Sequence, residues 1–107
     1  MAKGPVDVLC IYRVKDGKDG EFRKLLEKHG PALKAAGLAG DAAPKIWKAE
    51  SGRKPGTIYV EQMQWKDEHA SSTAHQMPEV MAVWEPMGDL TEGMEFLHLQ
   101  PAGIGKS

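Results

Sequence analysis

The sequence predicts an α+β fold of the ferredoxin-like type, with the element order β-α-β-β-α-β. Four segments rich in β-branched, aliphatic and aromatic residues have the composition of strands, and two segments repeat apolar residues at helical spacing. One helix follows the first strand and the other follows the third. This order predicts a four-stranded antiparallel sheet with both helices on one face.

The first strand is predicted from Pro5 to Val14, and apolar residues on both of its sides indicate burial on two faces. The first helix is predicted from about Asp19 to Ala36, with Gly37 as its C-cap. Gly30-Pro31 predicts a kink or break in this helix, because proline lacks a backbone donor. The apolar stripe of the helix comprises Phe22, Leu25, Leu26, His29 and Leu33.

A short second strand is predicted from Lys45 to Glu50, and residues 51–56 have the composition of a hairpin loop. The third strand follows this loop and ends at Trp65. The last strand is predicted from Met94 to Gln100, after a turn at residues 91–93.

The second helix is predicted to begin with Asp67 as its N-cap. Pro78 steers the preceding residue away from helical geometry, so two helical pieces are expected to meet at Met77-Pro78. The residues predicted to share one apolar face are Ala70, Ala74, Met77, Met81, Trp84 and Gly88.

The length of 107 residues predicts one domain over residues 1–107, with a core from about 5 to 101 and a tail at 102–107. The 14 basic and 15 acidic residues are scattered, which argues against binding to nucleic acid. No apolar run is long enough for a membrane span, so no membrane partner is expected. The first residues lack the apolar segment of a signal peptide, and a cytoplasmic location is the expectation.

The candidate ligands for metals and cofactors are few. Cys10 is the single cysteine and stands in an apolar run, so a buried structural thiol is favoured over a nucleophile. His69 and His75 are six residues apart on the predicted helix, and their side chains do not converge. No recognised metal-ligand spacing, phosphate loop or dinucleotide motif is present, and we expect no metal and no cofactor.

The predicted sheet has helices on one face only. Its other face carries apolar and aromatic side chains from several strands, and a patch of that size is a liability on a monomer. A homodimer formed through the open sheet face is therefore expected.

The segment from Val60 to Met87 reads V-E-x-x-x-W-K-D-E, then A-H-x-x-P-E-V, then W-E-P-M. This pattern resembles the antibiotic-biosynthesis-monooxygenase-like domains of the dimeric α/β-barrel superfamily, over roughly residues 5–101. The resemblance implies a barrel made by two sheets in a dimer, with a substrate pocket between sheet and helices. Its members include cofactor-independent oxygenases of quinone-like substrates, haem-degrading enzymes and domains with no assigned reaction.

The haem-degrading branch can be compared by residue. The resemblance implies an Asn on the first strand, a Trp near position 74 and a His near position 84. This chain contains no Asn, and Ala74 and Trp84 occupy the other two positions. Haem degradation of that kind is not expected.

His75 and Glu61 are the candidate catalytic residues. An imidazole titrates near neutral pH, so His75 beside the Pro78 break could remove a proton from a phenol or an activated carbon. The alternative is a helix-terminal histidine bonded to a backbone group. Glu61 shares a strand face with apolar side chains, and a desolvated carboxylate is a usable base. Its alternative is a structural pair with a neighbouring Lys, Arg or His.

The candidate substrate-binding side chains are aromatic, methionine and histidine residues: Tyr12, Trp65, Met77, Met81, Trp84 and His98. Trp65 and Trp84 could equally be packing anchors. Trp47 is a further strand residue that could line a cavity, and His29 is expected to be a satisfied core histidine.

Two functions follow from these residues and the resemblance. One is a cofactor-independent monooxygenase, an oxidoreductase acting on a small aromatic or quinone-like molecule. The other is a non-catalytic ligand-binding or structural homodimer of the same fold. An enzyme needs His75 or Glu61 at an accessible pocket, whereas protein partners would satisfy both in a structural dimer.

Overall fold

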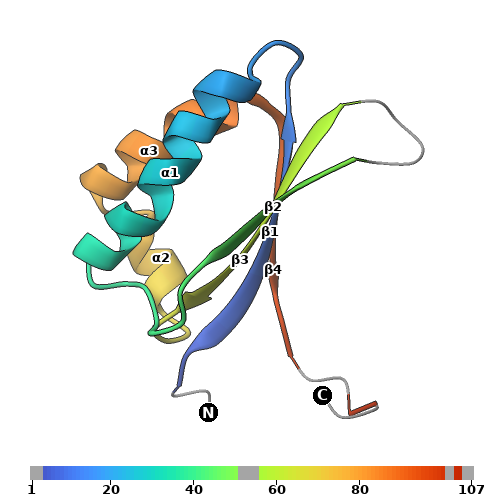
Figure 1. The fold of residues 1–107 in the computed structure, drawn as a ribbon. Coiled ribbons are helices and arrows are strands. Elements are labelled where there is room, and N and C mark those ends of the chain that lie inside the picture. The colour runs from blue at the N-terminus through green and yellow to red at the C-terminus, as the bar shows by residue number, and fades with distance from the viewer. Residues whose placement is uncertain (1–3, 51–55, 101–102, 105–107) are drawn as a thin grey trace.

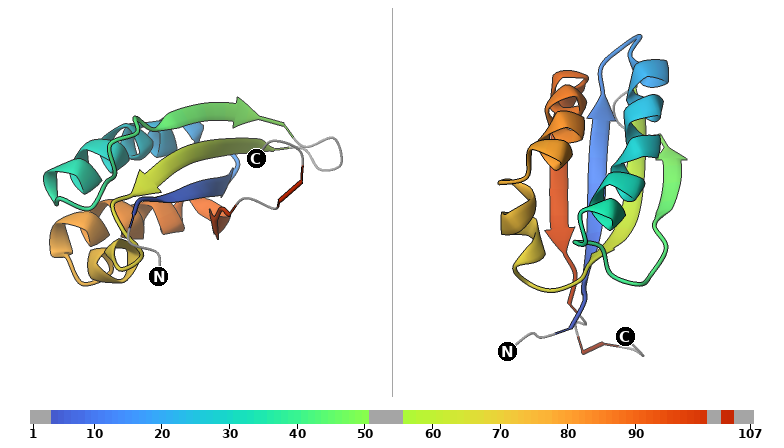
Figure 2. Two further views of the ribbon diagram at one scale, coloured as in Figure 1. Left: turned by 90° about the horizontal axis from the view of Figure 1, so that it is seen from below. Right: turned by 90° about the vertical axis from the view of Figure 1, so that its left-hand side faces the viewer.

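Four antiparallel strands form one sheet in the order β2-β3-β1-β4, and the helices cover one of its two faces (Figures 1 and 2). The computed structural model describes residues 4–50, 56–100 and 103–104. The elements are β1 (Val6–Val14), α1 (Asp19–Ala35), β2 (Lys45–Ala49), β3 (Thr57–Trp65), α2 (Ala70–Ala74), α3 (Pro78–Asp89) and β4 (Thr91–His98). This is the predicted order, with the second helix in two pieces. The predicted hairpin loop lies outside the described residues except for Gly56.

The register of the sheet sorts side chains onto two faces. Cys10 on β1 stands opposite Glu61 on β3 and Phe96 on β4, so these three side chains share the inner face under the helices. Alternation from these positions places one buried set on that face: Val8, Cys10, Tyr12, Val14, Tyr59, Glu61, Met63 and Trp65. The core therefore lies between the sheet and the helices.

Helix α1 packs on the inner face through Phe22, whose ring lies between those of Tyr12 and Tyr59, at centroid distances of 5.2 and 5.7 Å. The predicted break at Gly30-Pro31 does not occur, because α1 runs unbroken through Pro31 to Ala35. Buried side chains before and after the proline, His29 and Leu33, hold this part of the helix against the sheet. Gly37 follows the helix end with φ +75°, as a C-cap glycine does.

The second helix is interrupted as predicted. Met77 has an extended backbone (φ −103°, ψ 114°), and Pro78 starts α3. The prediction of Asp67 as N-cap was wrong: helix α2 begins at Ala70, and Asp67 Oδ1 accepts a hydrogen bond from the His69 amide (2.8 Å) in the preceding turn.

The predicted apolar face holds only up to the break. Beyond Pro78 the buried residues of α3 are Val80 and Met87, whereas Met81 and Trp84 are half-buried and Gly88 is exposed. The interruption rotates α3 relative to α2, so a single helical phase cannot describe both pieces.

The predicted turn at residues 91–93 was wrong, because β4 already begins at Thr91 and ends at His98. The pairing of β1 with β4 shifts between Arg13, which is opposite Gly93, and Val14, which is opposite Thr91. This irregularity leaves Glu92 as the extra residue of a β-bulge. The sequence pattern of such a bulge resembles that of a turn.

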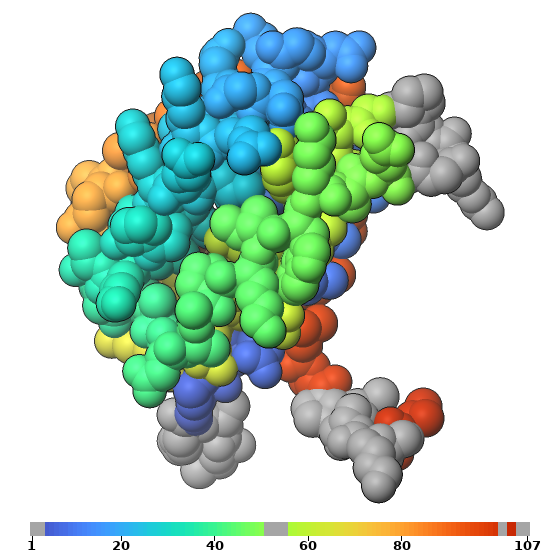
Figure 3. All heavy atoms as spheres, in the orientation of Figure 1, coloured from blue at the N-terminus to red at the C-terminus, as the bar shows by residue number. Residues whose placement is uncertain are grey.

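The segment after α1 returns along the sheet edge. Gly40 donates its amide to the Gln64 carbonyl (2.8 Å), and the Gln64 side chain accepts a hydrogen bond from the Ala42 amide (3.2 Å). In the space-filling view, the atoms of α1 and of this segment form one continuous surface beside β2 (Figure 3).

The opposite face of the sheet carries no helix (Figure 1). The register places six large apolar side chains there, which we call the outer apolar face: Leu9, Ile11, Trp47, Ile58, Val60 and Leu97. Trp47 and Leu97 are 49% and 41% exposed. No helix among the described residues is long and apolar enough to cross a membrane.

Candidate functional site

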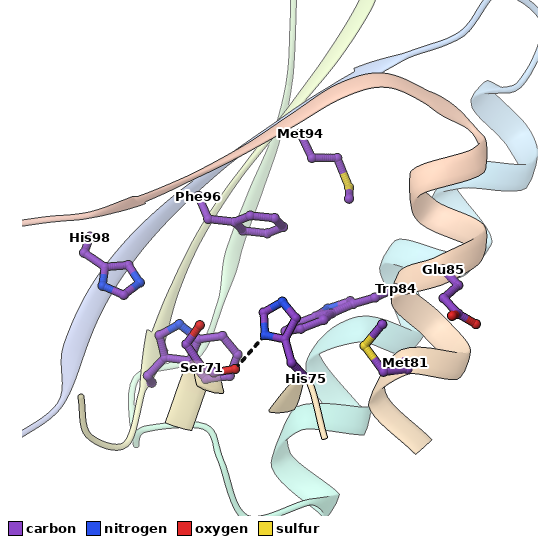
Figure 4. Close-up of a pocket in the computed structure, with 9 residues that line it drawn as sticks. Ser71, His75, Met81, Trp84, Glu85, Met94, Phe96 and His98 are labelled. Carbon is purple, nitrogen blue, oxygen red and sulfur yellow. Dashed lines mark hydrogen bonds between the residues drawn. The ribbon is translucent and has the colours of Figure 1, made fainter. Parts of the chain in front are cut away.

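A cavity of about 220 Å³ lies between helices α2 and α3 and the inner face of the sheet (Figure 4). We call it the aromatic cavity, and it is lined by Trp65, Ser71, His75, Met81, Trp84, Glu85, Met94, Phe96 and His98. Most of these side chains are aromatic or methionine. Apolar walls with a few polar groups are typical of sites for small organic molecules.

The rings of Trp65, Trp84 and Phe96 line one side of this cavity, which we call the aromatic wall, and Trp84 contacts both of the others. Between ring centroids, Trp84 lies 6.1 Å from Trp65 in an edge-on arrangement and 6.3 Å from Phe96. The centroid of the His75 imidazole lies 4.9 Å from that of Trp84. Rings from α2, α3, β3 and β4 therefore meet in one cluster, and their flat faces suit a flat ligand.

His75 stands at the C-cap of α2 and is exposed at the cavity. Its Nδ1 atom lies 2.9 Å from the Ser71 carbonyl oxygen, as the dashed line in Figure 4 marks. A carbonyl oxygen only accepts hydrogen bonds, so Nδ1 carries a proton and is the donor of this hydrogen bond. In the neutral ring this hydrogen bond leaves Nε2 with its lone pair, which is the form of a general base.

Glu61 is in a different environment. Its side chain is 1% exposed, and its Oε1 atom accepts hydrogen bonds from the Tyr12 hydroxyl (2.7 Å) and from His29 Nδ1 (2.9 Å). Burial raises the pKa of Tyr12, and the nearby Glu61 carboxylate raises it further, so the tyrosine remains a hydrogen-bond donor. The carboxylate is thus held by two neighbouring elements, β1 and α1.

A second cavity, of about 550 Å³, lies on the other side of α1, under the 39–44 segment. Glu61 lines this second cavity and not the aromatic cavity. Its other walls are Gly30, Pro31, Leu33, Lys34, Ala39, Gly40, Asp41, Ala42, Ala43, Pro44, Met63 and Gln64. The two candidate bases of the sequence analysis therefore belong to different cavities.

The structure brings together five of the residues proposed from the sequence at the aromatic cavity: Trp65, His75, Met81, Trp84 and His98. It does not bring Tyr12 or Met77 there: Tyr12 is fully buried against Glu61, and Met77 packs against the core. Trp47 lies on the outer apolar face, away from both cavities. Their part in substrate binding remains a prediction.

Sequence reasoning missed Ser71, Glu85, Met94 and Phe96. A signal for two of them was present. Met94, Phe96 and His98 alternate along one strand, so a strand that contributes His98 to a site also presents the other two. Ser71 and Glu85 carried no comparable pattern.

Metal ligands do not gather in the described part of the chain. Across residues 4–50, 56–100 and 103–104, no group of three or more His, Cys, Asp or Glu side chains has the proximity that a metal site needs. His75 lines the aromatic cavity, and His69 lines neither that cavity nor the second one, so the two histidines do not meet at either.

Cys10 is fully buried on the inner face. Burial, and to a lesser degree the nearby Glu61, raises the pKa of the Cys10 thiol from 9.0 to about 12. The protonated thiol therefore persists in the folded protein at neutral pH, as expected of a structural cysteine.

This pKa predicts a loss of stability in alkali. Because the folded-state pKa lies above the unfolded value, the contribution of the thiol is complete below pH 9 and is lost as the pH rises toward 12. We expect the free energy of unfolding to fall above pH 9, by up to about 1.4 kcal/mol per pH unit. Urea unfolding at pH 8, 9 and 10 measures the slope. In Cys10→Ala the slope should be shallower; equal slopes would contradict the assignment.

No protein-family model and no curated protein sequence matches the chain. Solved structures do match it. The Arabidopsis thaliana protein At3g17210 superposes with a TM-score of 0.73 at 12% identity, over 94% of this chain and 98% of that one. SnoaB from Streptomyces nogalater, a cofactor-independent oxygenase, gives a TM-score of 0.69 at 16% identity, over 97% and 99% of the two chains.

A NIPSNAP family protein from Agrobacterium tumefaciens gives a TM-score of 0.65 at 18% identity, over 95% of this chain and 90% of that one. The chain has the antibiotic-biosynthesis-monooxygenase-like fold. This finding confirms the resemblance drawn from the segment between Val60 and Met87 at the level of fold.

Proposed function

We propose that the aromatic cavity binds a small, flat aromatic molecule and that His75 removes a proton from it. The observation that carries this proposal is the hydrogen bond from His75 Nδ1 to the Ser71 carbonyl, which leaves Nε2 as the acceptor. Trp84 lies against the same imidazole, so a ligand stacked on the aromatic wall is within reach of it.

The reaction proposed is oxidation by dioxygen without a cofactor. For a substrate with an acidic CH₂ group between aromatic rings, the C–H bond breaks and its proton goes to His75 Nε2. The electron pair remains on the substrate, which becomes an electron-rich anion. Dioxygen adds to this carbon, and the proton returns from His75 to give a hydroperoxide. Loss of water from the hydroperoxide leaves a carbonyl group, so one dioxygen is consumed and one water is formed.

Two further observations support this assignment. SnoaB, whose fold this chain shares, is a cofactor-independent oxygenase. The walls of the aromatic cavity are apolar apart from a few side chains, and an apolar site limits competing protonation of the anion by water. We propose that the protein acts as a homodimer joined through the outer apolar face, and that it is cytoplasmic.

A non-catalytic role is the second candidate function. The Glu61 carboxylate is satisfied by Tyr12 and His29, as in a structural core. His75 is hydrogen-bonded to a backbone carbonyl, as the non-catalytic alternative predicts for a helix-terminal histidine. In this case the aromatic cavity would bind a ligand without chemical change.

The test is ligand binding and oxygen uptake with anthrone as the probe, on the wild type and His75→Ala. A ligand at about 100 times its Kd should stabilise the wild type by about 2.7 kcal/mol, which a thermal shift detects. Loss of the base should lower the oxygen-uptake rate by about 100-fold or more. The anthrone-dependent thermal shift should persist in His75→Ala, because the aromatic wall is intact.

His69→Ala is the matched control, since His69 is exposed on the preceding turn and does not line the aromatic cavity. Its rate should equal that of the wild type. Binding without oxygen uptake in the wild type would favour the ligand-binding function. The absence of any thermal shift with anthrone, simple quinols and other flat phenols would overturn the proposal.

A further inference from the structure

The second cavity has no part in the proposed function, although its volume of about 550 Å³ exceeds the 220 Å³ of the aromatic cavity. It is enclosed by the second half of α1, the 39–44 segment and the end of β3. Its floor is formed by the buried side chains of Leu33, Glu61 and Met63. Lys34 and residues 41–44 are exposed and form its mouth, so the cavity leads from solvent to a buried carboxylate.

Tyr12 and His29 satisfy only one of the two oxygen atoms of Glu61, since both donate to Oε1. Within the part of the chain that the structure describes, no donor reaches Oε2, and Oε2 is not one of the closed-off side-chain atoms that lack a partner. An oxygen that is neither bonded nor closed off borders open space. Because Glu61 lines the second cavity, Oε2 is a free acceptor at its floor.

The Glu61 carboxylate has no lysine or arginine as a partner among residues 4–50, 56–100 and 103–104. Its one ion-pair partner there is His29, whose ring is charged only when it is protonated. The other charged residues that line the cavity, Lys34 and Asp41, stand at its mouth and have opposite signs. A carboxylate in this situation favours a donor that carries a positive charge, because charge-assisted hydrogen bonds are the stronger ones.

The remaining walls indicate the shape of such a ligand. None of the described residues that line this cavity is aromatic, in contrast to the aromatic cavity. The side-chain amide of Gln64 is already engaged by the Ala42 amide and by Asp7. The rest of the lining is apolar or glycine: Gly30, Pro31, Leu33, Ala39, Gly40, Ala42, Ala43, Pro44 and Met63. These walls suit a compact aliphatic group.

We propose that the second cavity binds a small aliphatic primary amine in its ammonium form. The ammonium group donates a hydrogen bond to Glu61 Oε2 at the floor, and the hydrocarbon part lies against Leu33, Met63 and the 39–44 segment. This site is independent of the proposed function, because Glu61 lines the second cavity and His75 lines the aromatic one.

The test compares three ligands that share one ring and differ in charge: cyclohexylamine, cyclohexanol and cyclohexanecarboxylate. Titration calorimetry on the wild type at neutral pH should give a Kd for cyclohexylamine about tenfold lower than for cyclohexanol, because the charge-assisted hydrogen bond is roughly twice as strong as the neutral one. Cyclohexanecarboxylate should not bind, since its charge has the same sign as that of Glu61.

Two variants of the same cavity locate the charge that matters. Glu61→Gln keeps the shape of the side chain and removes its charge, so the preference for the amine over the alcohol should fall to about twofold or less. Asp41→Asn is the matched control, because Asp41 is a carboxylate at the exposed mouth. It should change the preference by less than about twofold, since exposed charges interact weakly.

A spectroscopic readout on the wild type needs no change at the buried Glu61. On addition of cyclohexylamine, the backbone amide resonances of Gly30 and of residues 39–43 should move. Those of Ser71 and His75, and the indole N–H resonance of Trp84, should remain in place, because these residues line the aromatic cavity.

The amine proposal fails if cyclohexylamine and cyclohexanol bind equally, or if none of the three ligands binds. A preference that persists in Glu61→Gln and disappears in Asp41→Asn would also overturn it, in favour of the mouth. Movement of the Ser71, His75 and Trp84 resonances in place of those of residues 39–43 would put the amine in the aromatic cavity and overturn the proposal as well. Each of these results leaves anthrone binding and oxygen uptake to be decided by their own experiment.

Discussion

Replacement of Glu61 by alanine is expected to lower the free energy of unfolding by about 3 kcal/mol. The carboxylate accepts hydrogen bonds from Tyr12 and His29, and all three side chains are buried. Its removal leaves a hydroxyl and an imidazole without partners in the core and opens a space beneath α1. Urea unfolding at neutral pH, fitted to a two-state transition, measures this loss.

Two variants separate the polar network from packing. Glu61→Gln preserves the shape and an oxygen acceptor, and it should lose about half as much stability as Glu61→Ala. Lys48 lies on the neighbouring strand β2 and forms an exposed ion pair with Asp19 of α1. Lys48→Ala removes this pair and should change the free energy of unfolding by less than about 0.5 kcal/mol. If Glu61→Ala unfolds at the same urea concentration as the wild type, the network does not stabilise the fold.

Replacement of Trp47 by glutamate is expected to raise the dissociation constant of the proposed homodimer by about 100-fold or more, relative to the wild type. Trp47 belongs to the outer apolar face and is aligned across the sheet with Val60 and Ile11. Tryptophan is enriched among residues whose loss costs about 2 kcal/mol or more at interfaces, and a symmetric dimer contains two copies. Sedimentation velocity across a concentration series measures the change.

Ile46→Glu is the matched control. Ile46 is the neighbour of Trp47 on β2, is 45% exposed against 49% for Trp47, and faces the opposite side of the sheet. The same charge at similar exposure should leave the dimer intact if the outer apolar face is the interface. A wild-type protein that is monomeric at high concentration, or equal weakening by both substitutions, would contradict this interface.

The order of elements and the sharing of one sheet face by alternate side chains could be predicted from the sequence, whereas which face lies under the helices could not. Strand alternation is a local property: Tyr59, Glu61, Met63 and Trp65 share a face whatever surrounds them. The interruption at Pro78 is also local, because proline restricts the residue before it. The bulge at Glu92 was missed, since it depends on how β4 pairs with β1 and not on its own sequence.

The composition of the site was decided by the tertiary structure. His75 is the C-cap of α2, Trp84 lies on α3 and Phe96 on β4, so their rings meet only because the fold packs these three elements together. The partners of Glu61 are 49 and 32 residues away in sequence, at Tyr12 and His29, so no spacing rule could pair them.

The sequence by itself therefore determined the fold, because the periodicity of strands and helices and the restrictions imposed by proline act over a few residues. It also supplied the candidate residues. Only the tertiary structure decided that His75 lies at the aromatic cavity while Glu61 is held by Tyr12 and His29 beside a second one. The physical reason is that hydrogen bonds and ring contacts depend on distances between segments that the packing of helices on the sheet brings together.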